Sequence, residues 1–135
     1  MEISAGLLII QQNKILLAHP TNAPWYGTYS IPKGKLEKDE TPLEAAIRET
    51  HEEVGIIIDI KDIKDKDKPH IIEYKNQLGN IYKTLYYFVV EPNEEIIISK
   101  GKLQKREINW AGFLNKDEGM SRIFWRFEEM LKYIS

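Results

Sequence analysis

Three glutamates, Glu49, Glu52 and Glu53, lie close together in one segment that has the pattern of a helix. At about 100° per residue they share one helix face. Carboxylates at these spacings repel one another, and Glu52 and Glu53 also sit near the negative end of the helix dipole. Two interpretations of this unfavourable cluster are open. It is either a solvated acidic face or a site for a hard divalent cation such as Mg²⁺, which prefers oxygen ligands.

The helix that carries the glutamates has clear start and stop signals. Thr41 is a suitable N-cap, Pro42 suits the first helical position, and Glu44 completes a capping box. The helix is predicted to run through Val54, and Gly55 then provides a left-handed stop. Its apolar stripe faces away from the glutamates and predicts packing on a sheet; it consists of Leu43, Ala46, Ile47, Thr50 and Val54.

The glutamates belong to a longer spaced motif. Its specified residues are, in order, Gly34, Glu40, Arg48, Glu49, Glu52, Glu53 and Gly55. The segment 34–56 resembles the Nudix box, and every strictly specified residue of that motif is present. A chance match at a given start is on the order of 10⁻⁸ at ordinary residue frequencies. One departure is Thr50, where the family usually has an aliphatic residue, and its methyl group can still face the sheet.

The resemblance implies both a fold and a metal site. The fold class is α/β, a Nudix-type α/β/α sandwich with a mixed central sheet, formed by one domain over residues 1–135. The cofactor is Mg²⁺ or Mn²⁺, with the ligands Glu49, Glu52, Glu53 and the carbonyl of Gly34. Arg48 is the orienting partner of the carboxylates, and Glu40 pairs within the box.

The implied chemistry is metal-dependent hydrolysis of a phosphoanhydride bond. Glu52 or Glu53 is the first choice for the group that takes the proton from water, together with Arg48 in the catalytic set. Glu118 is an outside candidate for this base. An acid in the first turn of a C-terminal helix is the more ordinary interpretation of Glu118, because acids are favoured there.

The flanking residues suggest a substrate. Pro32-Lys33-Gly34 at the entry to the box resembles the dinucleoside-polyphosphate and diphosphoinositol-polyphosphate branches of the family, and a small nucleotide of the first class is the leading candidate. Lys33 and Lys35 are predicted to meet phosphates, and Tyr74 and Tyr82 to stack on a base. Nucleoside triphosphates, capped RNA ends and nucleotide sugars stay open as alternatives, as does a non-catalytic module that senses nucleotides.

Hydrophobic patterns predict the surrounding elements. Strands are expected at residues 5–10, 14–18, 56–58, 71–75, 81–90, 94–99 and 108–111, with a charged loop at 33–40. A C-terminal helix is expected over about 117–134. The apolar stripe of this helix, predicted to lie in the core, consists of Ile123, Phe127, Met130, Leu131 and Ile134.

Composition narrows the class of protein. The chain has 135 residues, a net charge of −2 and no cysteine, which excludes disulfides, thiol catalysis and cysteine-bound zinc. The small net charge argues against a stable nucleic-acid partner. The apolar runs are too short to span a membrane, and the N-terminus lacks a signal-type pattern, so a cytoplasmic location is expected.

Overall fold

The computed structural model describes residues 1–135, and its centre is a six-stranded sheet. The strands are β1 (Glu2–Gln11), β2 (Lys14–Pro20), β3 (Lys33–Lys35), β4 (His70–Lys75), β5 (Ile81–Val90) and β6 (Ile108–Leu114). Their order is β4-β5-β1-β2-β6, with β3 paired to β1. Because β1 and β5 are parallel while the other pairs are antiparallel, the sheet is mixed, as predicted.

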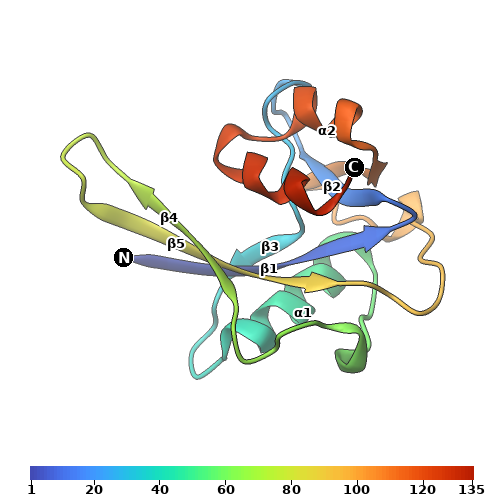
Figure 1. Cartoon of the computed structure of the whole chain (residues 1–135), viewed down its shortest axis with the longest axis horizontal. Coiled ribbons are helices and arrows are strands. Elements are labelled where there is room, and N and C mark those ends of the chain that lie inside the picture. The colour runs from blue at the N-terminus through green and yellow to red at the C-terminus, as the bar shows by residue number, and fades with distance from the viewer.

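Helical segments cover both faces of the sheet (Figure 1). The helix α1 (Pro42–Val54) lies on one face, and α2 (Lys116–Arg122) and the 3₁₀ segment η3 (Trp125–Tyr133) lie on the other. Alternation along β1 divides its side chains between two buried clusters, with Leu7 and Ile9 on the α1 side and Leu8 on the other. This arrangement confirms the predicted α/β/α sandwich.

Local signals fix α1 as predicted. The side chain of Thr41 accepts a hydrogen bond from the Glu44 N–H, Glu44 accepts one from Thr41 N–H, and Gly55 ends the helix at φ 74°. The predicted stripe packs inward, and Thr50 is fully buried with its hydroxyl donating to the carbonyl of Ala46 at 2.8 Å. The Thr50 departure from the motif therefore leaves no unpaired polar group in the core.

Two hairpins join the paired strands. Between β1 and β2, Gln12 and Asn13 both have positive φ (52° and 58°), the pattern of a two-residue turn that suits the sheet's twist. The β4–β5 hairpin extends beyond the body of the molecule, on the left of Figure 1. The predicted strands at 5–10, 14–18, 71–75, 81–90 and 108–111 are confirmed, most with longer ends.

Residues 33–40 are not wholly the charged loop that the sequence predicts. The first three form β3, which pairs with β1 through Ser4↔Lys35 and Gly6↔Lys33. Gly6 permits this approach, because a Cβ there would lie 2.5 Å from the carbonyl oxygen of Pro32. The pairing ties the start of the glycine-glutamate motif to the centre of the sheet.

Two predicted strands are wrong. Residues 56–58 form no strand; Ile57 is exposed, and the short helix η1 (Ile60–Asp62) follows. Residues 94–99 form none either, and the short helix η2 (Lys100–Lys102) follows them. There the side chain of Gln11 binds both backbone groups of Ile96, at 3.0 and 2.6 Å. An amide side chain thus takes the place of a neighbouring strand.

The prediction of a single C-terminal helix over about 117–134 is also wrong. The chain is extended at Ile123, where two backbone hydrogen bonds join it to Tyr29. The N–H of Tyr29 donates to the carbonyl of Arg122, and the N–H of Phe124 donates to the carbonyl of Tyr29. These bonds replace helical ones and divide the segment into α2 and η3. The predicted core stripe is nonetheless buried throughout, from Ile123 to Ile134. No helix is both long and apolar enough to cross a membrane.

Candidate active site

Arg48 is the centre of the carboxylate cluster on α1. Its guanidinium donates to both oxygens of Glu40, at 2.7 and 3.0 Å, and one nitrogen, Nη1, donates to Glu49 at 2.8 Å and to Glu52 at 3.1 Å. Nη2, one of the two nitrogens that bind Glu40, also donates to the carbonyl of Lys35 at 3.0 Å. The two-pronged bond to Glu40 fixes the plane of the guanidinium, so the bonds to the other carboxylates have a set direction.

These contacts also shift the pKa values of the partners. The hydrogen bonds to Glu40 above all raise the pKa of Arg48, and the Arg48 guanidinium lowers the pKa of Glu40. The main-chain N–H of Glu37 donates to Glu40 as well, at 2.8 Å. Glu40 is thus an ionised structural partner of Arg48, the arrangement that the sequence implied for it.

Glu49 lies directly against Gly34. A Cβ at position 34 would overlap the carboxylate of Glu49, so only glycine fits between β3 and this side chain. The Glu49 side chain is 13% exposed, and burial raises its pKa despite the hydrogen bond from Arg48. Gly34 therefore makes room for a carboxylate whose loss of hydration is only partly offset by the hydrogen bond from Arg48.

Glu53 is the most buried of the three glutamates, at 6% exposure. Its Oε1 accepts a hydrogen bond from the main-chain N–H of Lys33 at 3.0 Å, and Oε2 has no protein donor. Burial raises the pKa of Glu53 to about 8, and the negative charges of Glu49 and Glu107 add to this shift. No ion pair compensates Glu53, which is costly for a buried carboxylate.

The three glutamates do not form a ready-made set of three ligands. No three His, Asp or Glu side chains converge in an arrangement that would hold a metal ion by themselves. Glu49 and Glu53 are one helical turn apart on the side of β3, whereas Glu52 is 47% exposed and turned to Arg48. The ligand set Glu49, Glu52, Glu53 and Gly34 stays a prediction.

The residues present nevertheless fit a hard divalent cation. Glu49 and Glu53 offer only oxygen donors, and their raised pKa values indicate a shortage of positive charge around them. Mg²⁺ commonly binds through one or two carboxylates, with water and phosphate oxygens completing its shell. Two such carboxylates on one rigid helix meet that requirement.

Sequence reasoning missed Glu107, which precedes β6. This exposed carboxylate lies near enough to Glu49 and Glu53 for its charge to raise the pKa of both. The loop that carries it is bound to α1, since Gln104 N–H donates to the carbonyl of Glu53 at 2.9 Å. No spacing in the sequence reveals this contact, because it depends on how that loop packs.

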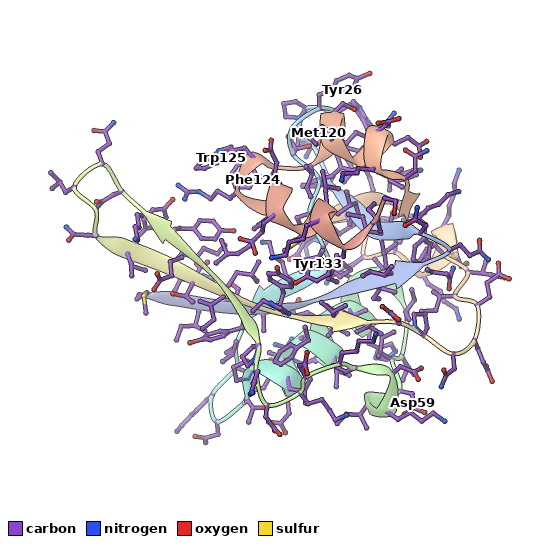
Figure 2. The ribbon with its side chains drawn as sticks, in the orientation of Figure 1. Tyr26, Asp59, Met120, Phe124, Trp125 and Tyr133 are labelled. Carbon is purple, nitrogen blue, oxygen red and sulfur yellow. The ribbon has the colours of Figure 1, made fainter.

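A pocket of about 210 Å³ lies on the other side of β3 from Gly34. Alternation along β3 directs Lys33 away from the side that Gly34 offers to Glu49. The pocket is lined by Pro20, Thr28, Ser30, Lys33, Tyr74, Lys83, Phe124 and Phe127. Figure 2 shows Phe124 and Trp125 at the end of the C-terminal segment that faces the β4–β5 hairpin.

Two ammonium groups line this pocket. Lys83 pairs with Glu2 at 3.0 Å, whereas Lys33 takes part in none of the ion pairs of the structure. Burial, with the charge of Lys83, lowers the pKa of Lys33. Aromatic rings lie beside both, Phe127 at 5.9 Å from Lys33 Nζ and Tyr74 at 5.1 Å from Lys83 Nζ. The pocket thus offers positive charge and flat apolar surface together, which suits a nucleotide phosphate and its base.

The other predicted substrate residues lie differently. Tyr74 lines the pocket, and burial raises its pKa to about 12. Tyr82 is half exposed outside it, where its hydroxyl accepts a hydrogen bond from Arg126 at 3.3 Å. Lys35 is largely exposed and paired with Glu2 at 3.2 Å, so the structure does not bring its side chain into the pocket.

Lys83 and Phe124 are pocket residues that sequence reasoning missed. The β4–β5 register opposes Tyr74 and Lys83, so counting back from the hairpin turn would have found the lysine. Phe124 had no such signal, because it depends on the break in the C-terminal helix. A larger hollow of about 430 Å³ lies elsewhere and is lined in part by Glu91, Glu94 and Glu95, which would repel phosphate.

Comparison with known proteins gives a family match. The model of the NUDIX domain matches residues 2–121. The fold is similar to that of an Ap4A hydrolase from C. elegans, with a TM-score of 0.73 and 22% identity, covering 98% of this chain and 93% of the other.

Two curated relatives match a shorter stretch. An 8-oxo-dGTP diphosphatase from Proteus vulgaris is 39% identical over 57 residues, which is 42% of this chain and 51% of the relative. An ADP-ribose pyrophosphatase from Methanocaldococcus jannaschii is 41% identical over 56 residues, which is 42% of this chain and 33% of the relative. The matched stretch therefore spans about half or less of these relatives.

Proposed function

The chain belongs to the NUDIX domain family, and from this premise we propose that it hydrolyses a phosphoanhydride bond of a nucleoside polyphosphate with the help of Mg²⁺ or Mn²⁺. One observation carries the proposal: Lys33 links the two parts of the site. Its main-chain N–H holds Glu53, and its ammonium lines the aromatic pocket. A carboxylate pair for a cation and a cationic pocket for an anion are thus joined by one residue.

In the proposed reaction, separate residues bind the substrate and the cation. Lys33 and Lys83 bind the phosphates that precede or follow the cleaved bond, while Tyr74 and Phe124 flank the base. Glu49 and Glu53 hold the cation, and Arg48 keeps Glu49 in its orientation. When bound, a divalent cation supplies neutralisation of the phosphate charge and a lower pKa for water.

The reaction forms a bond between water oxygen and phosphorus and breaks the bond from that phosphorus to the bridging oxygen. The proton of the water passes to a carboxylate, and the leaving phosphate departs with the bridging oxygen. Glu52 and Glu53 are the assigned proton acceptors. Oε2 is the receiving atom of Glu53, because Oε1 already accepts from Lys33 N–H. Glu107 is a third carboxylate beside this site, since its charge raises the pKa values of Glu49 and Glu53.

Dinucleoside polyphosphates are the leading substrates that we propose. The support is the Pro32-Lys33-Gly34 entry to the motif and a pocket of about 210 Å³, which is too small for a whole dinucleotide and leaves a second nucleoside outside. A panel of diadenosine tetraphosphate, ATP, 8-oxo-dGTP and ADP-ribose tests this order. The highest kcat/KM is expected for the first, and a higher value for any other compound would replace it.

Metal titrations of turnover separate a ligand from a base. Replacing Glu49, which is assigned as a ligand only (Glu49→Gln), should raise the Mg²⁺ concentration for half-maximal rate. Replacing an assigned proton acceptor (Glu52→Gln or Glu53→Gln) should lower kcat at saturating Mg²⁺ by about a hundredfold or more. Glu73→Gln, an exposed carboxylate on β4, is the matched control and should change neither. Full turnover in both Glu52→Gln and Glu53→Gln would refute the mechanism.

A further inference from the structure

A second hollow lies on the face of the sheet opposite α1. It has a volume of about 320 Å³ and is lined by Trp25, Tyr29, Trp110, Leu114, Glu118 and Arg122. None of these residues lines the Lys33 pocket or belongs to the glutamate cluster on α1. Figure 2 shows Tyr26 of the neighbouring loop and Met120 of α2 on the same outer side of the molecule. This hollow is therefore separate from the site proposed for hydrolysis.

Trp25 is held in place from one side only. Its ring stacks on His19 with centroids 3.7 Å apart and planes 5° from parallel. His19 is buried and fixed in turn, with Nδ1 2.6 Å from Asn109 Oδ1 and Nε2 3.0 Å from the carbonyl of Ala23. Trp25 nevertheless stays 52% exposed, so a rigid indole with a free face borders the hollow.

Trp110 is a second flat surface. It lies opposite His19 in the pairing of β2 with β6, and two residues further along β6 is Gly112. A Cβ on Gly112 would lie 2.6 Å from the Trp110 ring, so the glycine allows the indole to lie flat on the strand. Two preordered indoles at one small hollow are a stacking surface for a planar ring.

The polar edge of the hollow comes from α2. Glu118 and Arg122 are four residues apart, a spacing at which they could pair, yet they form no ion pair. Glu118 turns back so that Oε1 accepts from Asn115 N–H at 3.0 Å. Arg122 faces the Tyr29 phenol, where its charge opposes the rise in the pKa of Tyr29 that burial causes. Oε2 of Glu118, the second lone pair of its Oε1 and most donors of Arg122 are left for a ligand.

We propose that this hollow is a binding site for a guanine base, with Trp25 and Trp110 stacking on the ring. The carboxylate of Glu118 accepts from N1–H and N2–H of guanine, and Arg122 donates to O6. Among the four RNA bases, guanine alone places two neighbouring N–H donors beside a carbonyl acceptor, which is the complement of a glutamate next to an arginine. The volume of about 320 Å³ is at the small end of ligand pockets and suits one base.

The three tryptophans of the chain provide an internal test. Titration with GMP is followed by the indole N–H signals of Trp25, Trp110 and Trp125 in a ¹H–¹⁵N spectrum, with EDTA present. The signals of Trp25 and Trp110 should shift and saturate together, while that of Trp125, which does not line this hollow, should not. The absence of divalent cations makes the outcome independent of the proposed hydrolysis.

Variants and other nucleotides decide the specificity. Glu118→Gln keeps an oxygen for the Asn115 N–H and should weaken GMP binding about tenfold, the range expected for one base contact. Glu73→Gln, an exposed carboxylate on β4 that lines neither pocket, should leave GMP binding unchanged, and AMP should bind at least about tenfold more weakly than GMP. Equal affinity for AMP and GMP, an unaffected Glu118→Gln protein, or shifts confined to Trp125 would each overturn the proposal.

Discussion

The buried carboxylate of Glu53 predicts that the protein without metal becomes less stable as the pH rises. The pKa of Glu53 is raised to about 8 in the folded protein, against 4.5 for an ordinary glutamate. The folded state therefore holds a proton between these values that the unfolded state has lost. Stability is greatest near and below pH 4.5 and falls as the pH approaches 8. Glu53→Gln stays neutral, so it should escape this loss.

The size of the effect follows from the same difference. Each unit of pKa difference corresponds to about 1.4 kcal/mol, so 8 − 4.5 gives an upper limit of roughly 5 kcal/mol at pH 8. Part of the repulsion comes from Glu49, which can take up a proton instead. We therefore expect Glu53→Gln to be about 2 to 4 kcal/mol more stable than the parent at pH 8 and about equal to it at pH 4.5.

Urea unfolding in EDTA at pH 4.5 and pH 8 measures this directly, with Glu73→Gln as the control carboxylate. Addition of Mg²⁺ at pH 8 should then stabilise the parent more than Glu53→Gln, because the cation binds the folded site. A Glu53→Gln protein that unfolds at lower urea than the parent at pH 8 in EDTA would refute the reasoning. That result would assign Glu53 a mainly structural role as the acceptor for Lys33 N–H.

Gly34→Ala should raise the Mg²⁺ concentration for half-maximal turnover at least about tenfold, because the new Cβ displaces Glu49. Gly101→Ala, whose Cβ meets no close atom, is the control, and an unchanged metal requirement in Gly34→Ala would contradict the contact between Gly34 and Glu49. Arg48→Lys should lose about a hundredfold in kcat and lower the melting temperature, since an ammonium cannot replace a fork that binds three carboxylates; near-parental kcat would show that the fork is dispensable. Lys83→Gln should raise KM about tenfold with little change in kcat, and a loss in kcat alone would place this lysine at the reacting phosphorus instead.

The elements set by neighbouring residues were predictable from the sequence. Helix α1 has its cap at Thr41, its proline at the first turn and its stop at Gly55 within the segment itself. The turn between the strands predicted at 71–75 and 81–90 is also local, because the N–H groups of Leu78 and Asn80 both donate to the side chain of Asn76. The motif also located Arg48 between Glu40 and the later glutamates, and the structure places Arg48 in contact with Glu40, Glu49 and Glu52.

Features that depend on distant residues were not predictable. The burial of Glu53 arises because β3 pairs with β1 and delivers Lys33 N–H to it. The break in the C-terminal helix arises because Tyr29, almost a hundred residues earlier, binds the backbone at 122–124. The same break brings Phe124 to the pocket lined by Lys33, and the loop before β6 brings Glu107 toward α1. Each depends on a pairing that periodicity within one segment cannot reveal.

The central claim is hydrolysis of a phosphoanhydride bond at the Glu49–Glu53 site. Its most direct test is incubation of diadenosine tetraphosphate with the protein and Mg²⁺ in H₂¹⁸O, with mass analysis of the products. One ¹⁸O atom should enter a single phosphorylated product per cleavage, only when Mg²⁺ is present, and the rate should fall about a hundredfold or more in Glu53→Gln but not in Glu73→Gln. Binding of every nucleotide in the panel without any incorporation of ¹⁸O, or equal incorporation by the Glu53→Gln protein, would contradict the account.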